Sequence, residues 1–198
     1  KYIAAVGKAP LNDMGRDEKL ALLINAYNVF TLQLILDHWN DGKLESIKDI
    51  PHSKRWKSKR WKVGGRTWSL DEIEHKQIRP KFKEPRIHFA LVCAAVSCPK
   101  LRNEAYRAED LEQQLADQAA YVHAHDHWFR FDKAANKVYL TRLYDWYSGD
   151  FEQVAGSVLQ YAADHSPHLK AALDVGKKPR IKWLDYDWKL NWKGNKEE

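Results

Sequence analysis

Cys98 is the residue of this sequence best suited to covalent chemistry. It follows an apolar stretch and precedes Pro99, which forces a turn, so its thiol can lie at the open end of a sheet, where reactive groups are often displayed. A thiol becomes a nucleophile only when a base or a positive field stabilises the thiolate, so the hypothesis requires a histidine partner. His75 and His88 are the nearest candidates along the chain.

The choice between these histidines depends on the elements that carry them. Residues 86–95 are rich in Ile, Phe, Leu and Val, which favours a buried strand, although the same pattern fits a buried helix segment. An extended strand rises roughly 3.3 Å per residue and would hold His88 about 30 Å from Cys98. This geometry disfavours His88 as the base.

His75 is the better candidate because a short helix is expected to carry it. Ser69, followed three residues later by a glutamate, predicts a helix start, and Pro80 predicts its end, which places the helix over residues 70–79. If this helix folds back over the strand, it brings His75 towards the thiol of Cys98.

Three carboxylates could orient the His75 ring. Asp71 and Glu72 lie four and three residues before it, on the same helix face. Glu74 points about 100° away around the helix, so its side chain would have to reach around. Helical spacing alone therefore favours Asp71 or Glu72.

The residues alone also leave other fates open for Cys98. Pairs of cysteine and histidine are common by chance, so an inert, partly buried thiol is the commoner interpretation. In an oxidising compartment, a disulfide with Cys93 is a further alternative.

Asn25 and Asn28 are the main polar interruptions of a predicted helix over residues 17–39 that is apolar nearly all round, which is typical of a central buried helix. Buried amides need several hydrogen-bond partners. The commoner interpretation is that they hold neighbouring loop backbones in place. The alternative is that one amide faces a substrate or an oxyanion.

Two further clusters could bind ligands. Residues 54–62 repeat a pattern of cations interleaved with tryptophans, which could bind phosphates and stack bases, but which also fits a solvated edge strand. His123, His125 and His127 could bind zinc from one face of a strand. They end a predicted helix, however, and no second cluster accompanies them, so we interpret them as surface histidines and expect no metal site.

The remaining patterns predict an α+β fold. Strands and helices do not alternate strictly, which favours helices packed around a small antiparallel or mixed sheet over a doubly wound one. No linker or repeat divides the chain, so we expect residues 1–198 to form a single domain. The expected elements are a hairpin at 60–68 around two glycines, a helix at 109–122, a strand pair at 128–132 and 137–140, helices at 150–163 and 167–173, and a closing strand at 180–190.

Composition excludes several classes of protein. The 198 residues include two cysteines, too few for a disulfide framework, and the longest strictly apolar run, Phe89–Val96, is too short to cross a bilayer. The formal charge of +6 favours anionic partners but is modest for a dedicated nucleic-acid binder.

Five motifs resemble, in order and spacing, the family called domain of unknown function 547. The resemblance covers about residues 17–191, nearly the whole chain. The motifs are Ile24–Asn28, Leu70–His75, His88–Leu91, Ser97–Leu101 and Tyr186–Trp188.

The resemblance implies a thiol hydrolase related to papain and transglutaminase-like folds, with the elements in permuted order. Carried across by motif, Cys98 is the nucleophile, His75 the general base and Glu74 the orienting carboxylate, which conflicts with the helical spacing above. Bacterial members are often exported, which implies a periplasmic or secreted protein and fits a chain that begins at Lys1.

We therefore expect a cysteine-dependent hydrolase or acyltransferase that acts on an amide bond of a peptide or γ-glutamyl substrate, without a cofactor. The positive charge, including Arg79 and Arg86, favours a carboxylate-bearing substrate. The residues expected to bind substrate or stabilise the oxyanion are Asn25, Asn28, Ser97, His88 and Arg79.

Two other functions compete with this one. A non-catalytic module could bind a ligand in the same groove without turning it over. Alternatively, residues 54–62 could bind nucleic acid or another polyanion, with an affinity that falls steeply with salt.

Overall fold

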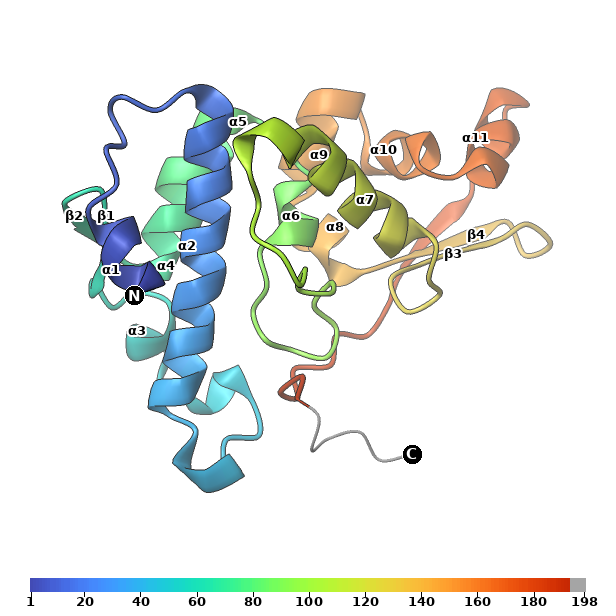
Figure 1. The fold of residues 1–198 in the computed structure, drawn as a ribbon. Helices are drawn as coiled ribbons and strands as arrows, with labels where there is room; N and C mark the ends of the chain where they lie inside the picture. The colour runs from blue at the N-terminus through green and yellow to red at the C-terminus, as the bar shows by residue number, and fades with distance from the viewer. Residues whose placement is uncertain (193–198) are drawn as a thin grey trace.

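Helix α2 (Arg16–Asp37) is the longest element and the centre of the first of two large hydrophobic cores (Figure 1). The computed structural model describes residues 1–192. The helix begins where the backbone N–H of Gly15 donates to the carboxylate of Glu18 (2.7 Å), and its apolar side chains are buried nearly all round. The predicted central helix is therefore confirmed.

Helix α2 is also, among the described residues, the one helix long and apolar enough to cross a membrane by length and composition alone. A buried core helix meets the same criterion, and most of this stretch is packed inside the protein. The finding is weak evidence for a membrane span.

Short elements around α2 contribute to the first core (Figure 1). The predicted hairpin is present, with antiparallel strands joined by two glycines at positive φ, which a two-residue turn of this kind requires. These elements are α1 (Tyr2–Gly7), α3 (His52–Arg55), β1 (Trp61–Val63) and β2 (Arg66–Trp68), with 3₁₀ turns at Asn40–Gly42 and Ile47–Asp49.

A three-part helical segment then carries Glu74 and His75. It consists of α4 (Leu70–Glu72), the π-helical turn η3 (Ile73–Ile78) and α5 (Arg79–Phe82). The predicted start is confirmed, because the hydroxyl of Ser69 accepts the backbone N–H of Glu72 at 3.0 Å. The predicted end is wrong: Pro80 lies in the first turn of α5, where a missing N–H costs nothing, and the helix continues to Phe82.

The second core lies on the other side of α6 (Ile87–Ala90) and contains a mixed sheet. Strand β4 (Lys137–Leu140) pairs antiparallel with β3 (Phe129–Asp132) and parallel with β5 (Arg180–Trp183). The helices around it are α7 (Leu111–His123), α8 (Arg142–Trp146), α9 (Ser148–Ala155), α10 (Val158–Asp164) and α11 (Pro167–Asp174), and a 3₁₀ turn (Ala108–Asp110) precedes α7. The predicted α+β class with a small mixed sheet is confirmed.

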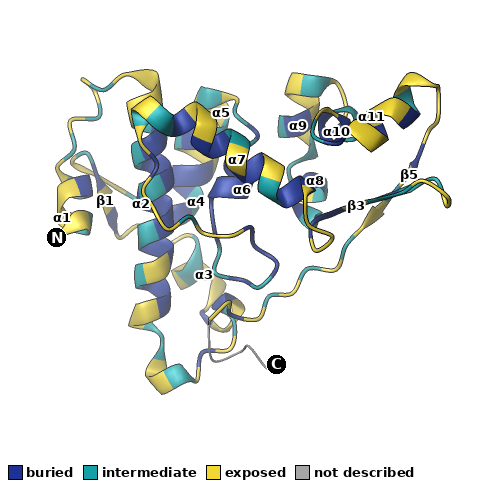
Figure 2. Ribbon diagram, turned by 45° about the vertical axis from the view of Figure 1, so that its right-hand side comes forward, coloured by how far each residue is buried: buried dark blue, intermediate teal, exposed yellow. Residues whose placement is uncertain are grey.

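The prediction of a strand over residues 86–95 is wrong. This segment forms α6, which is buried along its length, followed by an irregular loop (Figure 2). Its backbone is satisfied by side chains instead of a neighbouring strand: the amide of Asn28 bonds to Ala90 O (2.9 Å) and to Val92 N (3.0 Å). Periodicity cannot separate a strand from a helix when every face is buried.

Two other predicted elements are shorter than expected. The helix over 150–163 is divided into α9 and α10 at Gly156, which adopts a φ of +78°. The closing strand over 180–190 is regular only in β5. Beyond it, the chain runs back across the molecule and pairs with the loop after α6 (Figure 1), through Val96 N–Lys189 O (2.9 Å) and Asn191 N–Ala94 O (2.8 Å).

Candidate active site

A cavity of about 240 Å³ lies where the two halves of the chain and the C-terminal segment meet. The predicted triad residues Cys98, His75 and Glu74 all contribute to its wall. His75 and Trp146 are exposed, so they mark its opening to solvent. The other lining residues are Tyr27, Trp56, Asp71, His88, Leu91, Cys93, Leu143, Tyr147, Tyr186 and Trp188.

Cys98 is held at the wall of the cavity by two hydrogen bonds to its sulfur. The backbone N–H of Cys93 lies 2.9 Å from Cys98 Sγ, and the hydroxyl of Tyr186 lies 3.2 Å from it. Burial disfavours the thiolate, but hydrogen bonds from Cys93 and Tyr186 outweigh it and lower the pKa of Cys98 to about 7. Cys98 is therefore the thiol with nucleophilic character.

Cys93 is a free thiol in the same cavity, so the Cys93–Cys98 disulfide is not formed in this structure. Its sulfur lies 3.3 Å from the same Tyr186 hydroxyl. The hydrogen bond with Cys98 and burial raise the pKa of Cys93 well above the ordinary thiol value. Of the two thiols, Cys98 is therefore the one whose ionisation is favoured.

Ser97 holds the C-terminal segment against the Cys98 loop. Its backbone N–H donates to Asp187 O (3.2 Å), its hydroxyl accepts the N–H of Asp187 (2.8 Å), and its carbonyl accepts the indole N–H of Trp128 (2.9 Å). We expected Ser97 to contact substrate. The structure instead commits its polar groups to positioning the neighbouring Tyr186.

His75 lies on η3 at the rim of the cavity, with its ring engaged by Arg79. Arg79 Nη1 lies 3.0 Å from Nδ1 of His75 and can only donate, so Nδ1 accepts and the ring proton is assigned to Nε2. Glu74 lies 3.9 Å from Nδ1, and Asp71 lies 3.7 Å from Nε2, both too long for a hydrogen bond. Neither candidate carboxylate orients the ring in this arrangement.

Glu74 is buried and faces Tyr147. Burial, followed by the charge of Glu74 and a hydrogen bond to it, raises the pKa of Tyr147, so that phenol stays neutral and donates.

His88 reaches the cavity, contrary to the prediction that it lies far from Cys98. That prediction depended on a strand, whereas α6 and the following loop turn the chain back. The ring is buried, stacks on Tyr147 with centroids 3.8 Å apart, and places Nε2 2.8 Å from Oδ2 of Asp150. Burial lowers the pKa of His88, so the ring is neutral and Nε2–H donates to Asp150.

Asp150 is the member of this site that sequence reasoning missed. It also accepts two hydrogen bonds from Arg79, Nε–Oδ2 at 2.6 Å and Nη2–Oδ1 at 3.1 Å. Although burial opposes ionisation, the hydrogen bonds from His88 and Arg79 hold the pKa of Asp150 below its ordinary value. No local sequence signal connects Asp150 with residues more than sixty positions earlier.

The two arginines expected to attract an anionic substrate are already paired. Arg79 binds Asp150, as described above. Arg86 binds Glu84 (2.6 Å) and Glu112 (2.7 Å), and these hydrogen bonds raise its pKa further. The reason for expecting a carboxylate-bearing substrate is therefore removed.

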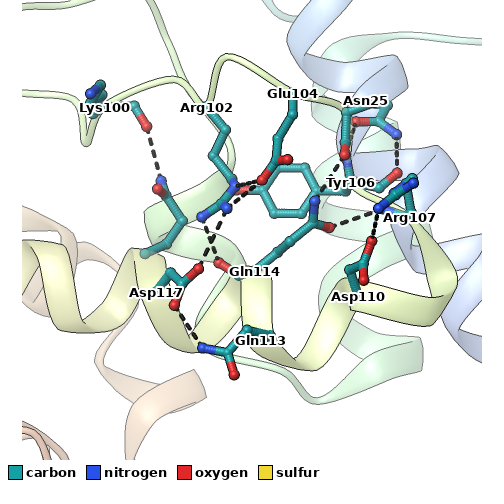
Figure 3. A network of polar contacts seen from close by, with 12 residues as sticks. Asn25, Lys100, Arg102, Glu104, Tyr106, Arg107, Asp110, Gln113, Gln114 and Asp117 are labelled. Carbon is teal, nitrogen blue, oxygen red and sulfur yellow. Dashed lines mark hydrogen bonds and ion pairs between the residues drawn. The ribbon is translucent and has the colours of Figure 1, made fainter.

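Asn25 and Asn28 hold backbones in place, as the commoner interpretation predicted, and neither lines the cavity. Asn28 binds the loop after α6, as described above. Nδ2 of Asn25 donates to the backbone carbonyl of Tyr106 (2.8 Å), and Oδ1 of Asn25 accepts the backbone N–H of Tyr106 (2.9 Å) (Figure 3). Because both amides bind backbone groups outside the cavity, the structure does not place either of them to stabilise an oxyanion there.

The loop that follows Cys98 is secured by α7. Gln118 donates to Phe89 O (2.7 Å) and Lys100 O (2.9 Å), and Gln114 bridges Ala105 O and Arg107 N (Figure 3). These side chains connect α6, the Cys98 loop and α7 into one support. Cys98 therefore lies on a loop whose two ends are fixed.

The basic strip at residues 54–62 does not form a continuous surface. Trp61 is buried and stacks on Phe30 at 4.7 Å, and Trp56 lines the cavity. Arg60 pairs with Asp37, and Lys59 pairs with Glu72 at 2.9 Å. This geometry does not favour polyanion binding.

His123 is buried and is not a surface histidine. Its Nδ1 bonds to Ala119 O (2.7 Å) and its Nε2 to the hydroxyl of Tyr144 (2.6 Å), so both ring nitrogens are used in the second core. Within residues 1–192, no group of three or more potential ligands is placed to hold a metal ion.

The chain belongs to the family described as protein of unknown function, DUF547, whose model matches residues 11–121, more than half of its length. The matched region contains Asn25, the Glu74–His75 pair and Cys98, and it ends before Tyr186. No curated protein and no solved structure shows significant similarity to the chain.

Proposed function

We propose that this protein is a cysteine-dependent hydrolase or acyltransferase that acts on an amide bond, with Cys98 as the nucleophile. One observation carries the proposal: the sulfur of Cys98, held by hydrogen bonds with the Cys93 N–H and the Tyr186 hydroxyl, shares a solvent-connected cavity with two histidines and a buried carboxylate. Catalytic groups with shifted pKa values cluster in such cavities. An inert structural thiol requires neither a shifted pKa nor histidines beside it.

His75 is the proposed general base. Among the described residues, no imidazole nitrogen is hydrogen-bonded to Cys98 Sγ, so the proton transfer requires the His75 side chain to turn from Arg79 into the cavity. An exposed side chain on a helix surface changes rotamer readily, and catalytic hydrogen bonds often tighten only when substrate binds. His88 is the poorer base because its ring is buried and is held by stacking on Tyr147.

The proposed reaction proceeds through a covalent intermediate. The thiol proton passes to His75, and the sulfur of Cys98 attacks the carbonyl carbon of the amide. The C–N bond then breaks, the amine leaves with the proton from His75, and water or a second amine resolves the thioester. A relationship to papain and transglutaminase-like enzymes in permuted order belongs to this proposal, as does export to the periplasm or outside the cell.

The substrate class is proposed from the wall of the cavity. Trp56, Trp146 and Trp188 supply flat apolar surfaces, and the free charges at the wall are those of Asp71 and Glu74. A small amide or short peptide with an apolar group beside the scissile bond fits these surfaces.

Iodoacetamide alkylation tests the nucleophile. Both thiols fall in one tryptic peptide, residues 87–100, and fragment masses separate Cys93 from Cys98. We expect Cys98 to react first at neutral pH and His75→Ala to slow it, while His168→Ala, which removes an exposed histidine on α11, leaves the rate unchanged. Equal and slow labelling of both thiols in all three proteins would contradict the proposal.

A non-catalytic binding module is the second candidate, favoured by the lack of a hydrogen bond between Cys98 and an imidazole in the described part of the chain. It predicts that a cavity ligand found by thermal-shift screening binds Cys98→Ser as tightly as the wild type. It also predicts that no screened amide is turned over faster by the wild type than by that variant.

A further inference from the structure

Tyr186 occupies a fixed position beside the proposed nucleophile, although it comes from a segment beyond the family match. The main-chain pair between Ser97 and Asp187 anchors this segment next to Cys98. The rings of Trp146 and Trp188 lie 4.8 and 4.7 Å from the Tyr186 ring. Because the backbone is anchored and the ring packs against both tryptophans, which also stack on each other at 5.6 Å, the hydroxyl has little freedom to leave the sulfur.

The hydroxyl of Tyr186 is the donor in its contact with Cys98. Burial, followed by the negative charge on Cys98, raises the pKa of Tyr186, so the phenol keeps its proton. A thiolate can only accept, so the single O–H points to Cys98 Sγ at 3.2 Å. The sulfur of Cys93 also lies 3.3 Å from the phenol oxygen.

We propose that Tyr186 is a catalytic residue whose hydroxyl stabilises first the Cys98 thiolate and then the oxyanion formed on the acylating carbonyl. This inference rests on the proposed function, because it takes Cys98 as the nucleophile. It supplies the oxyanion donor that Asn25 and Asn28 cannot provide.

The chemistry follows from where the charge moves. When the sulfur attacks, a C–S bond forms and the π pair of the carbonyl moves to its oxygen, two bonds from the sulfur. A donor already aimed at the sulfur is therefore close to the new negative charge, and the N–H of Cys93 lies on the same sulfur as a second donor. Tyr186 keeps its proton throughout, and the leaving amine receives the proton that His75 removed from the thiol.

Tyr186→Phe tests this role because it removes one oxygen and keeps the ring that packs against the two tryptophans. We expect iodoacetamide alkylation of Cys98 to slow about fivefold at pH 7, since a lost hydrogen bond to a charged sulfur reduces the thiolate fraction more than it raises nucleophilicity. At high pH, where the thiolate is complete in both proteins, the variant should catch up with the wild type and overtake it, because its more basic thiolate is the stronger nucleophile. A purely structural role for Tyr186 would not produce this pH dependence.

Tyr139→Phe is the matched control, because it removes a hydroxyl from a half-buried tyrosine on β4 that does not line the cavity. It should leave the alkylation profile unchanged. Thermal unfolding of both variants checks that the fold is retained. An alkylation profile in Tyr186→Phe that coincides with the wild type would overturn the inference.

A second substitution covers the case in which Tyr186→Phe does not fold. A fluorinated tyrosine at position 186 has a more acidic hydroxyl and donates a stronger hydrogen bond. The pH profile of Cys98 alkylation should therefore move to lower pH. An unmoved profile would also overturn the inference. If His75→Ala slows alkylation while both Tyr186 variants have no effect, only the role of Tyr186 fails. If wild-type Cys98 is no more reactive than Cys93, the proposed function itself fails.

Discussion

Nε2 of His88 lies 2.8 Å from Oδ2 of Asp150, and Arg79 binds the same carboxylate through two hydrogen bonds. This relationship connects α6 and the helical segment that carries His75 to α9, on opposite sides of the cavity. It also keeps Arg79 beside His75. Asp150 therefore supports the site without contacting the proposed nucleophile.

Asp150→Asn should destabilise the protein, because it leaves Arg79 without its charge partner and weakens the bond to buried His88. We expect a loss of about 1–3 kcal/mol in the free energy of unfolding, measured in urea at pH 7. Asp145→Asn is the control: Asp145 pairs with Arg142 at 3.2 Å on the surface, where such a pair is worth about 0–1 kcal/mol. Equal losses of unfolding free energy in the two variants would show that Asp150 and its partners Arg79 and His88 contribute no more to stability than a surface ion pair.

The stabilisation by Asp150 should disappear in acid. Its folded-state pKa is below the ordinary value, so the unfolded chain binds this proton first as the pH falls. The contribution is therefore complete above the ordinary carboxyl pKa and is lost below it. Urea unfolding from pH 7 down to pH 3 should show the wild type and Asp150→Asn converging in stability, whereas a constant difference would argue against the shift.

His123 should make stability depend on pH between about 4 and about 6.5. Burial, together with the charge of the stacked His165 ring, lowers its pKa to about 4 against the opposing effect of the backbone hydrogen bond to Ala119 O. The unfolded chain therefore binds this proton first, and stability falls by about 3 kcal/mol as the pH drops through that range. His123→Gln should be less stable at pH 7 but should lose less on acidification, and parallel curves would contradict this assignment.

Ser97→Ala should affect both stability and the reactivity of Cys98. It removes the hydroxyl that accepts the N–H of Asp187, which should cost about 1–3 kcal/mol because a buried donor is left unpaired. It should also release Tyr186 from the sulfur and slow alkylation of Cys98 at pH 7. Ser157→Ala, which removes a helix cap at the exposed start of α10, should destabilise the protein without changing that rate.

Elements with local signals were predictable from the sequence. The apolar length of α2, the glycine pair of the β1–β2 hairpin and the Ser69 cap each specify a structure through neighbouring residues. The segment around His88 was mistaken for a strand because its backbone partners are the side chains of Asn28 and Gln118, which lie far away in the sequence. Burial on every face also erases the periodicity that separates a helix from a strand.

The candidate site was predictable only where motifs marked it. Cys98, His75 and Glu74 do line one cavity, but the spacing of residues along the chain could not show that Arg79 is hydrogen-bonded to Nδ1 of His75. Asp150 carries no motif, and Tyr186 belongs to a motif whose wording gives no role. Both reach the site through tertiary contacts, which residue spacing along one chain does not encode.

Acyl transfer from an activated ester tests the central claim most directly. On mixing the protein with p-nitrophenyl acetate, we expect a burst of nitrophenolate equal to the protein concentration and an acetyl group on Cys98, located in the 87–100 peptide. Cys98→Ala should abolish the burst and His75→Ala should slow it, while Cys93→Ala should retain it. A burst of the same size in Cys98→Ala, or acetylation of lysines alone, would contradict the account.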